Sequence, residues 1–212
     1  MYNLVVEKGG ITVTVMQEIT NSSANLTITL PNGNMNTEVV VKPDTPPVIA
    51  GGLDSIFQDE MVYTPEDKEI VAAGGTVEFK LVVEKQDTPP AAIQIEAVKP
   101  ANQTIGLYLD LSITKTVTQN GGTETTTIVS QVGSLIQTII PLPAELQGKS
   151  SYTVYREHDG VVEALPSSGN GERYEVSADK TSITIYASKY STYAIAWSSS
   201  TPIDPGPVTP SR

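Results

Sequence analysis

The sequence LYLDLSIT, at residues 107–114, is the most informative segment for the fold class. Three leucines and an isoleucine alternate there with Tyr, Asp, Ser and Thr. Successive side chains of a strand point to opposite faces, so this pattern predicts a strand with one buried and one polar face. The whole chain has the same bias, since its 212 residues include 65 Val, Ile and Thr but only 12 Leu. β-Branched side chains pack well in sheets and lose rotamer freedom in helices.

Strand signals continue on the C-terminal side of this segment. The turn at 120–122, NGG, predicts a hairpin into residues 125–129, and the Asp-Gly turn at 159–160 predicts a second hairpin. In the last expected strand, large residues alternate with two alanines, which predicts a central strand that is covered on both faces. The remaining expected strands are residues 137–142, 151–158, 161–165, 174–176, 182–186 and 192–197.

The N-terminal side contains fewer strands and two helical segments. TPEDKEIVAA, at residues 64–73, begins with a hydroxyl cap, proline and acids, which predicts a helix that ends at Gly74. A weaker signal of the same kind, with Thr88 before two prolines, predicts a helix over residues 91–98. The expected strands are 77–84 between the two helices and 11–15, 26–30 and 38–41 before them.

These elements predict a mainly β protein, an antiparallel β-sandwich with one or two short helices, preceded by a small β-meander. The prolines at 43–47 mark the expected boundary. We expect a meander at 1–44 that could end a preceding domain, a linker at 45–50, a sandwich module at 51–198 and a Pro/Ser/Thr-rich tail at 199–212.

Charge and composition exclude several classes of function. The net charge is −11, so the chain lacks the basic surface that nucleic acids or anionic membranes require. Cysteine is absent, which excludes disulfides and thiolate chemistry. No segment is apolar enough for a membrane span or a signal peptide. The linker-like tail predicts a monomeric module of a longer chain, with any signal peptide and anchor outside this segment.

His158 is the only histidine. It lies between Glu157 and Asp159 at a hairpin tip, where a pH-sensitive or metal-binding role is conceivable, but we predict an exposed polar residue. Further carboxylates gather at residues 59–60 and 66–69. The sequence lacks a DxDxDG calcium loop, so we predict solvated acids and no metal or cofactor, with a calcium site left open.

The aromatic residues offer the alternative of a sugar-binding surface. Tyrosines on one sheet face could stack on sugar rings, whereas cross-strand packing would bury them, and we favour packing. An exposed planar row would indicate a carbohydrate-binding module, and buried tyrosines would indicate a structural module. The aromatic residues concerned are Tyr152, Tyr155, Tyr174, Tyr186, Tyr190, Tyr193 and Trp197.

Three further motifs have simple interpretations. Asn21, Asn25 and Asn102 match the N-glycosylation pattern, and we interpret them as turn residues. Lys80 and Lys115 lie on expected strands and could donate an internal isopeptide bond, although the sequence does not pair them. The absence of a GxSxG motif argues against a serine hydrolase, so we predict no enzyme and no catalytic residues.

Five motifs together resemble a module near the C-terminus of large surface proteins of Gram-positive gut bacteria. The resemblance covers about residues 51–198 and implies an extracellular, wall-associated location without known catalytic residues. Lys189 and Tyr190 stand where members of this family often have Asp and Phe. The motifs are TPEDK at 64–68, GLYLDLSI at 106–113, PLPAEL at 141–146, YTVYREHDG at 152–160 and KYSTYAI at 189–195.

We therefore expect a non-enzymatic, extracellular structural or adhesion module of a bacterial surface protein. Its partner would be a host or cell-wall glycan or protein. The alternative is a carbohydrate-binding module of a secreted or wall-bound protein.

Overall fold

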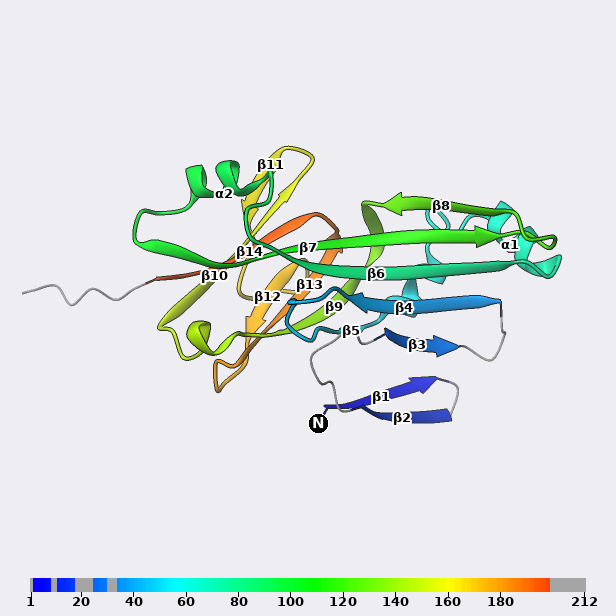
Figure 1. Cartoon of the computed structure of the whole chain (residues 1–212), viewed down its shortest axis with the longest axis horizontal. Coiled ribbons are helices and arrows are strands. Elements are labelled where there is room, and N and C mark those ends of the chain that lie inside the picture. Colours follow the sequence, from blue (N-terminus) through cyan, green and yellow to red (C-terminus); the bar gives the residue numbers. More distant parts are fainter. Residues whose placement is uncertain (1, 9–10, 18–24, 30–33, 199–212) are drawn as a thin grey trace, which may run out of the picture.

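The structure is a computed structural model that describes residues 2–8, 11–17, 25–29 and 34–198, with side chains described from residue 34 to 198. Its strands form a large sheet of eight strands, a second sheet of four strands and a separate pair, β1 and β2. The two larger sheets share one hydrophobic core. The prediction of a mainly β, sandwich-like protein is confirmed (Figure 1).

We call the part of the molecule formed by the two larger sheets the body. The large sheet is built around one long strand, β7 (Gln103–Thr118), which runs from one end of the body to the other (Figure 1). One side of β7 pairs with β6 (Thr76–Gln86). Its other side pairs with β14 (Thr192–Ser198) and, further along, with β8 (Glu124–Val129). β14 also pairs with β10 (Ser151–His158), so the central position predicted for the last strand is confirmed.

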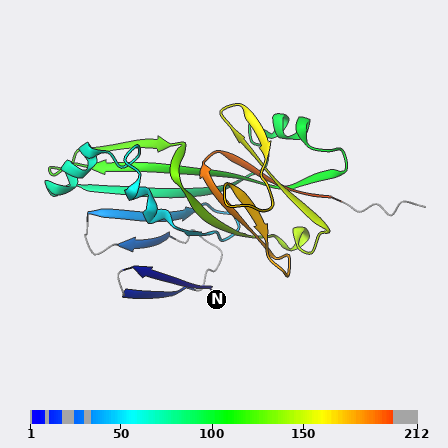
Figure 2. The same cartoon turned by 180° about the vertical axis from the view of Figure 1, so that it is seen from behind.

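The second sheet lies against the half of the large sheet that contains β10 and β14 (Figure 2). Its strand order is β12-β13-β9-β5, and every pairing is antiparallel. The alternation at residues 107–113 faces the core as predicted, because its apolar side chains are at most 2% exposed. The strands of this sheet are β5 (Ile49–Gly51), β9 (Gln131–Pro141), β12 (Arg173–Val176) and β13 (Ser182–Lys189).

Two α-helices are present where the sequence predicts them. α1 (Pro65–Ala72) begins with a capping box, in which Thr64 Oγ1 accepts from the Asp67 amide and the Asp67 carboxylate accepts from the Thr64 amide. α2 (Ala92–Val98) begins after both prolines, with Ala91 as its N-cap instead of Thr88. Two 3₁₀ helices, η1 (Leu53–Gln58) and η2 (Ala144–Leu146), were not predicted from the sequence patterns.

α2 covers the outer face of β14. Ala91 and Ile95 pack with Ala194 and Ala196, which are fully buried. Small side chains on β14 allow this close approach, so the predicted coverage of the alanine side is confirmed.

Strand pairing crosses the expected boundary at residues 45–50. β4 (Met35–Val41) pairs in parallel with β6, the one parallel pairing among the described strands, and β5 joins the second sheet. β3 (Asn25–Thr29) is antiparallel to β4, while β1 (Tyr2–Lys8) and β2 (Ile11–Gln17) pair with each other.

The tail predicted at residues 199–212 lies outside the described residues. Within the described residues, no helix is long and apolar enough to cross a membrane.

Two hairpins follow the predicted turn chemistry. Asp159 and Gly160 have φ values of 51° and 79°, the left-handed conformation that a tight two-residue turn between β10 and β11 (Val161–Ala164) needs. Gly121 and Gly122 likewise have positive φ in the turn between β7 and β8.

Candidate functional site

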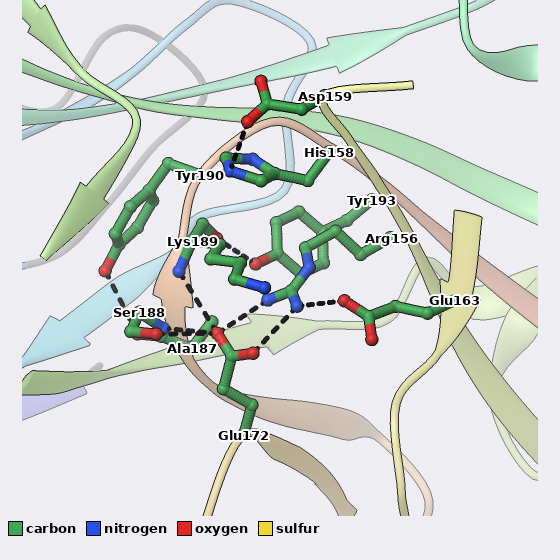
Figure 3. Close-up of polar contacts among 10 residues, drawn as sticks. All are labelled: Arg156, His158, Asp159, Glu163, Glu172, Ala187, Ser188, Lys189, Tyr190 and Tyr193. Atoms are coloured by element: carbon green, nitrogen blue, oxygen red, sulfur yellow. Dashed lines mark hydrogen bonds and ion pairs between the residues drawn. The ribbon is translucent and has the colours of Figure 1, made fainter. Parts of the chain in front are cut away.

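The densest polar cluster of the described residues surrounds Arg156, between the two sheets (Figure 3). Arg156 lies on β10, two residues after the buried Val154, so its side chain points to the core face. It is fully buried. A buried guanidinium is costly unless anions and hydrogen bonds compensate for its charge.

Two carboxylates supply this compensation. Glu172, just before β12 of the second sheet, accepts two parallel hydrogen bonds, Nη1–Oε1 at 2.7 Å and Nη2–Oε2 at 2.8 Å. Glu163 on β11 accepts from Nη2 as well. Such paired geometry suits the planar guanidinium better than a lysine ammonium. The interaction therefore ties β10 to the chain that enters the second sheet.

Glu172 also fixes the end of β13. Its Oε1 accepts from the Ser188 amide at 2.9 Å, the Ser188 hydroxyl at 2.9 Å and the Lys189 amide at 3.2 Å. Burial alone would raise the pKa of Glu172, but hydrogen bonds from Arg156 and Ser188 outweigh it and lower the pKa to about 2.

Tyrosine hydroxyls complete this inter-sheet cluster. Tyr193 on β14 donates to the Lys189 carbonyl, and Tyr190 donates to the Ala187 carbonyl at 3.4 Å (Figure 3). Burial raises the pKa of Tyr193 to about 12, although Arg156 acts in the opposite direction. The pKa of Tyr190 is also raised by burial. Both hydroxyls therefore remain protonated donors at neutral pH.

A second inter-sheet link lies further along β10. Tyr174 on β12 donates to the Tyr152 carbonyl at 2.6 Å, and Tyr152 donates to the Leu146 carbonyl at 2.7 Å. We call Arg156, Glu172, Tyr193, Tyr174 and Tyr152 the inter-sheet brace.

The ionisable side chains of the brace have pKa values that are shifted away from neutrality. General acid–base catalysis works best with a group whose pKa is near the operating pH. The Glu172 pKa of about 2 and the Tyr193 pKa of about 12 are both far from neutrality. The Nε of Arg156 has no hydrogen-bond partner among residues 34–198, and the other guanidinium nitrogens are engaged. Glu172 and Glu163 already supply the anionic partners of this guanidinium.

His158 is placed differently from its prediction. Its side chain is only 11% exposed, and Nε2 lies 3.5 Å from Asp159 Oδ2. The prediction of an exposed hairpin residue is therefore wrong, because the imidazole of the last β10 residue is largely covered. Glu157 accepts from the Gly160 amide at 2.7 Å and from the Ser191 hydroxyl at 3.3 Å.

Most of the other acidic clusters have partners within the protein. Asp59 accepts from the amides of Met61 and Gly133, at 3.0 and 2.6 Å. Glu60 pairs with Lys68 at 2.8 Å, and the exposed Glu60 has a pKa lowered by this partner. In the part of the chain that the structure describes, no three His, Asp or Glu side chains converge as metal ligands do.

The two candidate lysines form ion pairs. Lys115 Nζ lies 2.8 Å from Asp67 Oδ2 and 3.0 Å from the Val62 carbonyl. Lys80 Nζ lies 3.0 Å from Glu38 and 3.1 Å from Glu78, and hydrogen bonds to these carboxylates raise its pKa. Both lysines therefore join neighbouring elements of the sheet half near α1.

The candidate aromatic residues form no exposed row. Tyr186 and Trp197 are half-buried, and each ring is covered by a cation: Arg173 lies 3.7 Å from the Tyr186 centroid and Lys149 lies 4.5 Å from the Trp197 centroid. These contacts occupy faces on which a sugar would stack. The buried ones are Tyr152, Tyr155, Tyr174, Tyr190 and Tyr193.

Of the three possible glycosylation motifs, the structure describes one asparagine side chain. Asn102 is exposed in a turn before β7. Asn21 lies outside the described residues, and Asn25 begins β3 in the segment without described side chains.

Arg156 and Glu172 were not among the residues that the sequence patterns indicated as candidates. The available signal was the position of Arg156 in its strand, because it shares the inward face with Tyr152 and Val154, where a charged residue requires a buried partner.

No family model, curated protein or solved structure matches this chain.

Proposed function

We propose that the chain is a non-enzymatic structural and adhesion module of an extracellular, cell-wall-associated bacterial surface protein. The observation that carries the proposal is the inter-sheet brace. Arginine, carboxylate and tyrosine side chains are typical of ligand-binding and active sites. In the brace, these side chains form hydrogen bonds that join one sheet to the other.

The placement of the tyrosines supports a structural module over a sugar-binding one. A sugar-binding surface needs aromatic faces that are open to the ligand. Five of the seven candidate aromatic residues are buried, and the two half-buried rings have a cation over them.

A bacterial surface location can be tested on intact cells. Antibodies raised against residues 34–198 should label unpermeabilised cells of the bacterium that encodes the chain, and brief protease treatment should remove the label. An antibody against a cytoplasmic enzyme is the matched control. Labelling that requires permeabilisation would contradict the proposal.

A glycan array tests the alternative. Purified protein should show no sugar-dependent signal, and Trp197→Ala should behave like the parent chain. A specific sugar signal that Trp197→Ala or Tyr186→Ala abolishes would replace the structural proposal with a carbohydrate-binding one.

A further inference from the structure

Two strands of the large sheet, β4 and β14, point in the same direction although they are far apart in the sequence. β4 is parallel to β6, β6 is antiparallel to β7, and β7 is antiparallel to β14. β4 and β14 are therefore parallel to each other. The chain enters β4 at one end of the sheet and leaves β14 at the opposite end.

The register shows how far apart these two points are along the sheet. Met35 pairs with Val77, which pairs with Val117 near the end of β7. Ser198 pairs with Gln103, the first residue of β7. At about 3.3 Å per residue, the two points lie on the order of 45 Å apart along β7. Figure 1 shows β7 joining the two ends.

This arrangement determines whether a pulling force loads the hydrogen bonds of the sheet together or one at a time. Hydrogen bonds between antiparallel strands, as in the pairs that β14 forms, are perpendicular to the strands, and those of a parallel pair, such as β4 with β6, are slanted but evenly spaced along the strands. A force along β4 and β14 in opposite directions therefore loads all the bonds of each strand together, in shear. A force across a strand pair breaks them one at a time.

We propose that the body is a force-bearing unit that is loaded in shear through β4 and β14. This inference rests on the proposed function, because an extracellular structural module transmits force between the parts of the chain on either side of it.

Both loaded strands are held along their lengths. All seven residues of β14 pair with both β10 and β7. β4 is bonded to β6 from the Asn34 carbonyl, which accepts from the Val77 amide at 2.8 Å, to the Lys42 amide, which donates to the Val83 carbonyl at 2.9 Å. β3 is antiparallel to β4. A force applied on the N-terminal side of β3 therefore separates the β3–β4 pairs one after another before it acts on Met35.

Single-molecule force spectroscopy tests the proposal directly. The chain contains no cysteine, so two introduced cysteines define the attachment points. The shear variant carries Asn34→Cys and Ser198→Cys. We expect its rupture force to exceed that of the control at the same loading rate by about twofold or more, because its hydrogen bonds share the load.

The control variant carries Ser151→Cys and Ser198→Cys, in residues that pair directly at one end of β10 and β14. Pulling on it unzips this pair. Thermal melts of both variants in the absence of force must match that of the parent chain, which excludes a difference in stability.

Equal rupture forces in the two geometries, or a lower force for the shear variant, would overturn the proposal. This result is independent of cell-surface labelling. A protein that is weak in shear but displayed on the cell would leave the proposed function standing, whereas one that is strong in shear but inside the cell would contradict the proposed function alone.

Discussion

The two halves of the body are stabilised by different kinds of contact. In the half formed by β9 to β14, the inter-sheet brace supplements the apolar core with a buried ion pair and tyrosine hydroxyls. In the half near α1 and η1, Phe57 contacts Tyr63 and Phe79 edge to face, with ring centroids 5.2 and 5.1 Å apart. We call these the braced half and the aromatic half.

The two kinds of contact predict which perturbations should destabilise each half. Apolar and aromatic packing depends on shape and is insensitive to proton concentration. An ion pair depends on the ionisation of its partners, and the loss of one partner leaves a buried charge. The braced half should therefore respond to acid through Glu172 and to the removal of its cation. The aromatic half, in which the ion pairs of Lys80 and Lys115 supplement the packing, should respond to changes in packing and capping as well.

The largest expected effect comes from removing β14. Truncation before Ser191 leaves β7 and β10 each without a neighbour, so we expect residues 106–190 to lose their cooperative melt and their dispersed amide NMR signals. Truncation after Ser198 keeps β14 complete and should retain both. If the shorter chain still melts cooperatively, the braced half does not depend on its central strand.

The next largest effect is expected for Arg156→Met. This change leaves the half-buried Glu172 without its cation and should lower the free energy of unfolding by about 3 kcal/mol, measured by denaturant titration. The double variant Arg156→Met with Glu172→Gln removes both charges and should be more stable than the single variant. A loss below about 1 kcal/mol for Arg156→Met would mean that the brace is dispensable.

Acid should weaken the braced half through Glu172. The carboxylate has a pKa of about 2 in the folded chain against an ordinary value of 4.5, so its stabilising effect is fully present above pH 4.5. It is lost as the pH falls from about 4.5 to about 2, at a cost of about 2–3 kcal/mol. Denaturant titrations across this pH range should show the loss.

The matched control for this acid effect is Glu172→Gln, which cannot titrate. Its stability should change less than that of the parent chain over the same pH range. Identical pH profiles for the two proteins would assign the acid sensitivity to other carboxylates.

The smallest effect tests the aromatic half. Thr64→Ala removes the hydroxyl that accepts from the Asp67 amide and should destabilise the chain by about 1 kcal/mol, whereas Thr64→Ser should restore the cap. An equal loss of stability for Thr64→Ser and Thr64→Ala would mean that the hydroxyl does not cap the helix.

Sequence patterns predicted the elements whose cause is local. The alternation at residues 107–113, the Asp159–Gly160 turn and the cap at Thr64 each depend on neighbouring residues, and each lies where it was expected. The start of α2 differs by a few residues, because the two prolines after Thr88 leave Ala91 as the N-cap.

Long-range pairing was not predictable in the same way. Glu172 is 16 residues from Arg156 and approaches it from the other sheet, so no local pattern joins them. The same holds for the parallel pairing of β4 with β6 and for the covered position of His158, which depend on elements that return from elsewhere in the chain.

Local sequence patterns therefore predict the β class, most strand positions and the inward faces, because backbone geometry and side-chain period act over a few residues. The packing of the two sheets sets which charged and tyrosine side chains meet between them and where the chain enters and leaves the large sheet. Those features depend on the packing of segments that are distant in the chain, and hydrophobic burial, which drives that packing, is non-directional.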